Sequence, residues 1–154
     1  MGNQVRPIPE GYHTVTPYLI CDRAADAIEF YKQAFGAEEV VKMPGPNGKV
    51  MHAEIKIGDS FIMLADENPE AGAKSAKTYG GSPIGILLYV ENCDAVVGAA
   101  VSAGAKITRP LKDEFYGDRA ATVVDPFGHT WNVHTHIKDV SPEEMKTAMQ
   151  AAGQ

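Results

Sequence analysis

The same order of predicted elements occurs twice in this chain of 154 residues. Residues 12–66 and residues 84–137 each contain a strand, a helix and three further strands. Gly36, expected to end the first helix in a left-handed conformation, aligns with Gly104 at an offset of 68, and Gly48 aligns with Gly117 at an offset of 69. This repeat predicts an α+β fold of two βαβββ modules with curved mixed sheets, each carrying its helix on the convex side, that form an open cup.

The spacing of apolar residues places the elements of each module. In the first module it predicts a helix over 24–37 and strands over 13–20, 37–44, 49–57 and 60–66. In the second it predicts a helix over 93–105 and strands over 84–91, 106–113, 117–125 and 129–136. Residues 67–83 have the composition of an exposed linker, and Ser141 followed by Pro142 predicts a terminal helix over 141–152. We expect a single domain spanning 1–154.

Composition narrows the classes of partner. The chain has 14 basic and 20 acidic residues and a net charge of −6, without a basic block, so nucleic acid and anionic membranes are poor partners. The first residues lack the apolar stretch of a signal peptide, which favours a cytoplasmic protein. Cys21 and Cys93 take equivalent places at the two strand-to-helix junctions, and we expect both to be reduced and structural.

Three motifs carry a family resemblance: "AIEFYKQAFGAE", "GDSFIML" and the closing "GDR…DPFGHTW". Over residues 13–136 they resemble the vicinal oxygen chelate superfamily, which includes glyoxalase I, bleomycin resistance proteins and extradiol dioxygenases, and in particular its PhnB-like branch. The resemblance implies the paired-module glyoxalase/bleomycin resistance fold and a homodimer. It also implies a divalent metal held by one ligand on the first and fourth strand of each module.

The four metal positions implied by the resemblance can be read residue by residue. They fall at Val15, Met63, Gly85 and Asn132. Val and Gly have no donor atom, a thioether is soft, and an amide oxygen is a weak ligand for a divalent ion. The sequence therefore predicts no metal cofactor at these positions.

Two histidines leave a metal-dependent alternative open. His13 and His134 lie two residues from the lost positions and hence on the same faces of their strands. With a third donor such as Glu54 or a substrate oxygen, they could hold a divalent metal with shifted geometry. The other histidines of the stretch 125–136 have structural interpretations, with His129 in a turn, His136 at a strand end, and Trp131 packed on the helix face.

Strand alternation predicts which other side chains face the cup. Met51, Ala53, Ile55 and Ile57 are assigned to the helix side. The predicted ligand-binding residues are His52, Glu54, Arg119, Tyr89, His13 and His134, around apolar Val15, Leu19, Phe61 and Met63. Alternatives remain for several of them: the strand from His52 to Lys56 can be a solvated face, Arg119 can pair with Asp118 or Asp125, and Tyr89 can belong to the core.

These features predict a small-molecule binding protein of the glyoxalase/bleomycin resistance type that uses no metal. Its ligand is organic and can be anionic, because Arg119 and His52 would hold an oxyanion. The alternative is a metal-dependent lyase, isomerase or dioxygenase with the shifted histidine ligands. A scaffold without ligand or chemistry is the third class.

Overall fold

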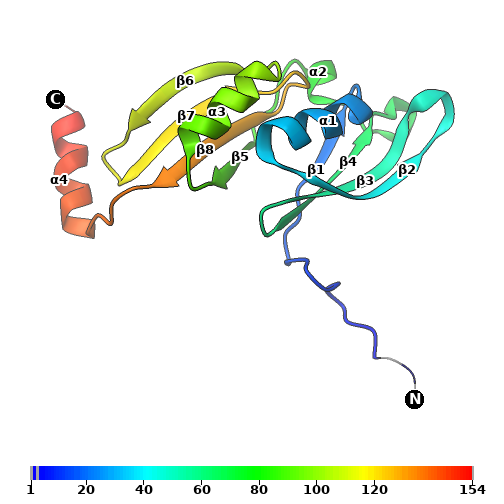
Figure 1. Cartoon of the computed structure of the whole chain (residues 1–154), viewed down its shortest axis with the longest axis horizontal. Helices are drawn as coiled ribbons and strands as arrows, with labels where there is room; N and C mark the ends of the chain where they lie inside the picture. Colours follow the sequence, from blue (N-terminus) through cyan, green and yellow to red (C-terminus); the bar gives the residue numbers. More distant parts are fainter. Residues whose placement is uncertain (1, 3, 154) are drawn as a thin grey trace. The chain divides into compact units, whose positions relative to one another are not determined.

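The computed structural model describes Gly2 and residues 4–153, and the chain divides into two compact units, one ending at Gly81 and one beginning at Ser82 (Figure 1). The first unit contains β1 (Tyr18–Cys21), α1 (Ala24–Phe35), β2 (Glu38–Pro44), η1 (Pro46–Gly48), β3 (Val50–Ile57), β4 (Ser60–Asp66), η2 (Pro69–Ala71) and α2 (Ala76–Tyr79). The second contains β5 (Gly85–Tyr89), α3 (Cys93–Ser102), β6 (Lys106–Asp113), β7 (Asp118–Val124), β8 (Thr130–His136) and α4 (Pro142–Ala152). The βαβββ repeat and the α+β class are confirmed.

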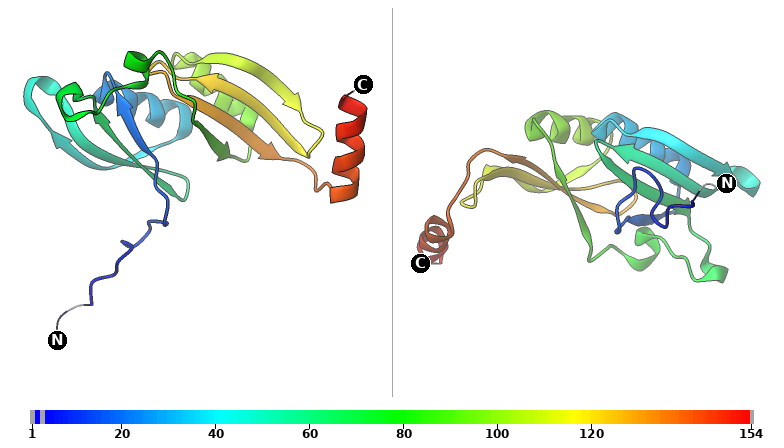
Figure 2. Two further views of the ribbon diagram at one scale, coloured as in Figure 1. Left: turned by 180° about the vertical axis from the view of Figure 1, so that it is seen from behind. Right: turned by 90° about the horizontal axis from the view of Figure 1, so that it is seen from below.

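Each unit contains one four-stranded mixed sheet with a helix on one face (Figure 2). In the first unit the strand order is β1-β4-β3-β2, and in the second it is β5-β8-β7-β6. The first and last strands of each module are parallel, and the other neighbours are antiparallel. We call the face away from α1 or α3 the open face of that sheet.

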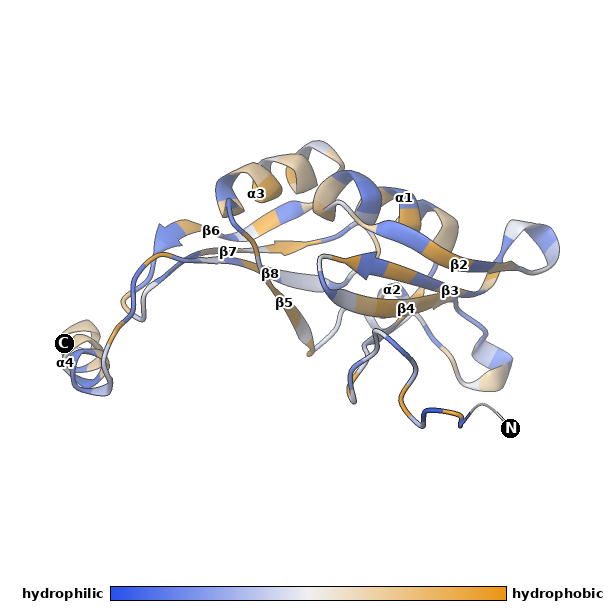
Figure 3. Cartoon of the chain, turned by 60° about the horizontal axis from the view of Figure 1, so that its bottom comes forward, coloured by the Kyte–Doolittle hydropathy of each residue, from blue (hydrophilic) through white to orange (hydrophobic). Residues whose placement is uncertain are grey.

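The core of each unit lies between its helix and its sheet. Ile28 and Tyr31 of α1 are buried with Ile55 and Leu64, and in the second unit Trp131 is fully buried. Hydrophilic and hydrophobic residues alternate along β3 (Figure 3), as expected for a strand with one face on a core. The predicted position of Trp131 on the helix side is confirmed.

The two helices begin with equivalent contacts. The main-chain N–H of Ala24 donates to the Asp66 carboxylate at 2.9 Å, and that of Cys93 donates to the Thr135 hydroxyl at 2.9 Å. Both acceptors stand at the end of the fourth strand of their module, so the same long-range contact satisfies a free N–H at each helix start. At the other end of α1, Gly36 has φ 68° and caps the helix as predicted.

The predicted start of the first strand is wrong. The first strand begins at Tyr18 and not at His13. The residue before it, Pro17, makes the first backbone contact with β4, because its carbonyl accepts from the N–H of Met63 at 3.0 Å. The interval 67–83 is mostly exposed, as predicted, and it also contains α2 and the fully buried Ser75. The Ser75 N–H and the Thr78 hydroxyl donate to Glu67 at 2.8 and 2.7 Å.

The terminal helix is confirmed. The Ser141 hydroxyl accepts from the N–H of Glu144 at 3.1 Å and caps α4 as the sequence predicts. Among the described helices, none has the length and apolar character needed to cross a membrane. The expected single domain over 1–154 stays a prediction, and Met1 and Gln154 lie outside the described residues.

Candidate functional site

A network of four polar side chains lies on the open face of the first sheet. The Tyr18 hydroxyl lies 2.8 Å from His52 Nδ1, and His52 Nε2 lies 3.2 Å from Glu54 Oε1. The Tyr12 hydroxyl donates to the other oxygen of Glu54. A neutral imidazole that carries its proton on Nε2 satisfies both of its contacts, accepting from Tyr18 and donating to Glu54. We call these four residues the Glu54 network.

Strand pairing explains why the network forms. His52 and Glu54 alternate along β3 with the buried Ala53 and Ile55, so both project to the open face. Met63 of β4 stands opposite Glu54, and Tyr18 of β1 stands beside Met63. The ladders therefore bring residues from three strands together, with apolar Met63 between the polar groups.

The network keeps Glu54 ionised. The hydrogen bond from Tyr12 lowers the pKa of Glu54, burial opposes this, and the contact with His52 lowers it further. Burial and the same hydrogen bond raise the pKa of Tyr12 to about 12. Burial and the Glu54 charge also raise the pKa of Tyr18. At neutral pH the network thus presents one carboxylate and two protonated phenols. Lys56 lies on the same face, with its Nζ 5.6 Å from the centroid of the Phe61 ring.

The open face of the second sheet carries a different network around Asp118. This carboxylate is 4% exposed and accepts from Tyr89 Oη at 3.2 Å, His134 Nδ1 at 2.9 Å and His136 Nδ1 at 2.7 Å. Burial tends to raise the pKa of Asp118, but the hydrogen bonds from His134, His136 and Tyr89 outweigh it and lower the pKa. Contacts with Asp139 and then Asp118 raise the pKa of His136.

The cavity beside this second network is small. It has a volume of about 30 Å³ and is lined by Arg109, Pro110, Glu114, Tyr116, Ala120, Ala121, Thr122, Asn132 and His134. Such a volume holds about one water molecule. The Asp118 network therefore offers hydrogen bonds but little room for an organic ligand.

The prediction that Arg119 faces the ligand is wrong. The open face of β7 carries Ala120 and Thr122, because Ala120 pairs with His134 and Thr122 pairs with Asn132. The equivalent of His52 is thus Ala120, at an offset of 68 rather than 69, and this shift of one residue moves Arg119 to the helix side. There Arg119 donates to Asp94 of α3 at 2.8 and 3.2 Å and to Asp113 at 3.0 Å. The alternative prediction for Arg119 was an ion pair with Asp118 or Asp125. Arg119 does form ion pairs, but its partners are Asp94 and Asp113.

The first strand also has a shifted register. Leu19 was predicted on the cup side, but it is buried in the core, and Tyr18 is the residue on the open face. His13 and Val15 precede β1 and are exposed, Val15 at 83%. His13 therefore does not share a strand face with the other candidates.

The register of β3 was predicted correctly only from His52 onwards. Met51 was predicted on the helix side but is 66% exposed, and Val50 is buried in its place. A register shift between Met43 and Pro44 of β2, opposite this end of β3, breaks the alternation.

The residues at the family's metal positions do not fit a divalent ion. Met63 offers only a thioether, and Val15 precedes its strand. The Asn132 oxygen accepts from Thr122 at 2.8 Å, and its amide nitrogen fills the space where a side chain at Gly85 would lie. Among Gly2 and residues 4–153, His, Cys, Asp and Glu form no group of three or more arranged to hold a metal.

Tyr12, Tyr18 and Asp118 were not among the predicted site residues. Tyr12 precedes the first strand and lies 42 residues from its partner Glu54, so no local pattern links the two. Tyr18 was not predicted on the open face, because the alternation of side chains was counted from His13. Asp118 could have been found, because a single carboxylate two residues along the strand from Ala120 shares the face of His134.

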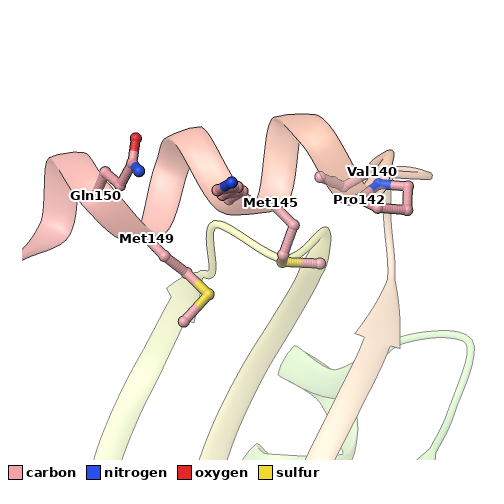
Figure 4. A pocket seen from close by; sticks show the side chains of 6 residues that line it. Val140, Pro142, Met145, Met149 and Gln150 are labelled. Carbon is pink, nitrogen blue, oxygen red and sulfur yellow. The ribbon is translucent and has the colours of Figure 1, made fainter.

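Another concave surface runs along α4 (Figure 4). It is lined by Val140, Pro142, Met145, Lys146, Met149 and Gln150. Met145 and Met149 project from the same side of the helix (Figure 4). This surface offers apolar contact with one charged group, Lys146, whereas the Glu54 network combines a carboxylate, an imidazole and aromatic rings. The Glu54 network is therefore the stronger candidate site.

Comparisons with known proteins agree with the fold. The family model "Glyoxalase/Bleomycin resistance protein/Dioxygenase superfamily" matches residues 12–133. The uncharacterized protein Rv0887c of Mycobacterium tuberculosis is 40% identical over 142 residues, which cover 90% of this chain and 84% of that protein. The solved structure of the Arabidopsis thaliana gene product At5g48480 is 30% identical with a TM-score of 0.65, covering 79% of this chain and 98% of that one. A PhnB protein from Bacillus cereus, 17% identical, has the same fold with a TM-score of 0.62 over 80% of this chain and 99% of its own.

Proposed function

Because this chain belongs to the glyoxalase/bleomycin resistance protein/dioxygenase superfamily, we propose that it binds a small organic ligand through its own side chains, without a metal. The ligand site is the open face of the first sheet at Tyr18, His52 and Glu54. The observation that carries the proposal is the Glu54 network, in which an ionised carboxylate, an imidazole and two phenols converge beside apolar Met63. Small-ligand sites combine apolar surface with a few convergent polar groups in this way.

The charge of this face selects the ligand. An ionised Glu54 can only accept hydrogen bonds, so it favours a ligand group that donates them. Lys56, the next outward residue of β3, adds a basic side chain to the same face, with its Nζ 5.6 Å from the centroid of the Phe61 ring. Arg119, which the sequence analysis assigned to an oxyanion, is engaged by Asp94 and Asp113 on the helix side of the other sheet. The proposed ligand therefore donates a hydrogen bond to Glu54 and has an apolar body.

Calorimetry on matched variants tests the binding site. Phenols, amines and organic acids are screened by thermal shift against the purified protein, because a ligand of the native state raises the melting temperature. The best hit is titrated into Glu54→Gln and His52→Ala. Loss of a charge-assisted hydrogen bond costs about 1.5–3 kcal/mol, so Glu54→Gln should weaken binding roughly tenfold to a hundredfold.

The control is Glu70→Gln, which removes an exposed carboxylate of the same unit from η2. It should leave the affinity unchanged. Equal affinities in the wild type, Glu54→Gln and His52→Ala would mean that the ligand does not bind at this network.

The metal-free part of the proposal has its own test. Elemental analysis of the purified protein should find no stoichiometric zinc, iron, nickel or manganese, and chelator treatment should leave the ligand affinity unchanged. About one metal ion per chain that is lost together with ligand binding would favour the metal-dependent alternative.

A further inference from the structure

The Glu54 network already contains a bound aromatic ring, because Tyr12 occupies it from the N-terminal side. The Tyr12 ring stacks on Phe61 with a centroid distance of 4.2 Å and an interplanar angle of 18°. Its hydroxyl donates to Glu54. Phe61 and Glu54 lie on neighbouring strands with Lys56 standing opposite Phe61, so the ring lies flat along the open face of the sheet. We call the space that the Tyr12 side chain fills the Phe61 slot.

The segment that carries Tyr12 makes little other contact with its unit. Residues 4–15 are all exposed except Tyr12, with Val5 at 87% and Val15 at 83%. Figure 1 shows the chain before β1 as an extended segment. The burial of this segment is therefore concentrated in one side chain, and little apolar area is lost from the protein core if that side chain leaves.

Gly11 allows the backbone next to Tyr12 to lie close to the Phe61 ring. Gly11 has φ +84°, and a Cβ atom there would lie 3.0 Å from Phe61 Cε2. The N–H of Tyr12 donates to the Pro9 carbonyl at 3.1 Å, which turns the chain at this point. The contact with Phe61 thus depends on a glycine in a left-handed conformation, which larger residues adopt only with strain.

We propose that the Phe61 slot is a recognition site for a phenolic ligand and that Tyr12 fills it as a displaceable internal occupant. The inference rests on the proposed ligand-binding function of this face and names the chemical class of the ligand. A phenol reproduces both contacts that Tyr12 makes: a planar ring over Phe61 and a hydroxyl that donates to Glu54. Binding forms and breaks only non-covalent contacts.

The geometry distinguishes a phenol from similar molecules. An aromatic ring without a hydroxyl retains the stack but leaves the Glu54 oxygen without its donor. An ionised aromatic carboxylate retains the stack but has no proton to donate to Glu54. An aliphatic alcohol can donate to Glu54 but cannot stack on the ring of Phe61.

Competition with Tyr12 sets the order of affinities. The measured affinity of a ligand that must displace an internal occupant is its affinity for the open site multiplied by the fraction of molecules in which the site is open. Tyr12→Phe retains the stack but loses the hydrogen bond, so its ring leaves more readily. Affinity for a phenol should therefore rise from the wild type to Tyr12→Phe and again to Tyr12→Ala.

The probe is p-cresol, which has the atoms of a tyrosine side chain. Calorimetric titration of p-cresol into Tyr12→Ala should show saturable binding at one site per chain, at least tenfold tighter than to the wild type. Toluene and 4-methylbenzoate should bind at least tenfold more weakly than p-cresol to the same variant, because neither has a proton to donate in a charge-assisted hydrogen bond to Glu54. Tyr12→Ala with Glu54→Gln should lose this preference for the phenol.

Tyr79→Ala is the matched control, since it removes a tyrosine that is 68% exposed on α2 of the same unit. It should bind p-cresol no better than the wild type. If Tyr12→Ala does not fold, Tyr12→Phe still tests the proposal through its predicted gain in affinity over the wild type.

Equal p-cresol affinity in the wild type, Tyr12→Phe and Tyr12→Ala would overturn the inference, as would equal binding of p-cresol and toluene to Tyr12→Ala. A ligand whose affinity depends on His52 and Glu54 but not on Tyr12 or Phe61 would leave the proposed function standing and reject the phenolic slot. Tight p-cresol binding to Tyr12→Ala, with no ligand bound by the wild type, would support the slot and count against the proposed function.

Discussion

Gly117 and Gly48 occupy equivalent places in the repeat, but an alanine should have very different effects at the two positions. Both have positive φ, 100° for Gly117 and 72° for Gly48, so alanine strains the backbone at each. Around Gly48 a Cβ atom meets nothing within 4 Å. At Gly117 it overlaps the main-chain oxygen of Lys138 and lies 3.0 Å from the Val140 side chain.

The difference in free energy follows from these contacts. Backbone strain costs about 1–2 kcal/mol at either glycine. Relief of the overlap at Gly117 requires movement of residues 137–140, and it disrupts the hydrogen bonds that the Gly117 carbonyl accepts from Ile137 at 2.9 Å and Lys138 at 3.0 Å. Each is worth about 0.5–1.5 kcal/mol, so Gly117→Ala should cost about 3 kcal/mol, against about 1–2 kcal/mol for Gly48→Ala.

Urea denaturation measures both values. Trp131 is the only tryptophan and is fully buried in the second unit, so its fluorescence reports the unit that contains Gly117, while far-ultraviolet circular dichroism follows the whole chain. With a slope of about 1–3 kcal/mol per M, a loss of about 3 kcal/mol in Gly117→Ala should lower the fluorescence midpoint by roughly 1–3 M. Equal small shifts of the urea midpoint in Gly117→Ala and Gly48→Ala would show that the chain after β8 does not lie against Gly117, and they would refute this prediction.

Three further outcomes follow from the networks. Glu54 has a pKa below its ordinary value of 4.5 and Tyr12 one raised to about 12, so their contact stabilises the fold between these limits. Its contribution is lost as pH falls through the Glu54 pKa or rises through that of Tyr12. The stability difference between the wild type and Tyr12→Phe, from urea melts, should therefore be constant from pH 5 to 9 and shrink in acid, and a difference independent of pH would contradict this. Arg119→Ala should lower the melting temperature but leave ligand affinity unchanged, whereas weaker binding by calorimetry would return Arg119 to the site. The chain should be a homodimer, because β1, β2, β5 and β6 are sheet edges, and light scattering near 16.5 kDa at micromolar concentration would refute it.

The local pattern of the sequence determined the elements and their order. Each element of the repeat depends on neighbours within a few residues. The same holds for the Gly36 cap, the Ser141 cap and the alternation from His52 to Ile57, and all are confirmed by the structure. Two of the predicted site residues, His52 and Glu54, share the open face for the same reason.

Only the tertiary structure decided which chain segments complete the site. A strand has a side-chain period of two, so a register error of one residue moves every side chain to the other face. That error exchanged Leu19 for Tyr18 and placed Arg119 on the wrong side of its sheet. Tyr12 joins Glu54 across 42 residues through a segment without regular structure, and such a contact depends on packing against Phe61 rather than on any periodic pattern around Tyr12.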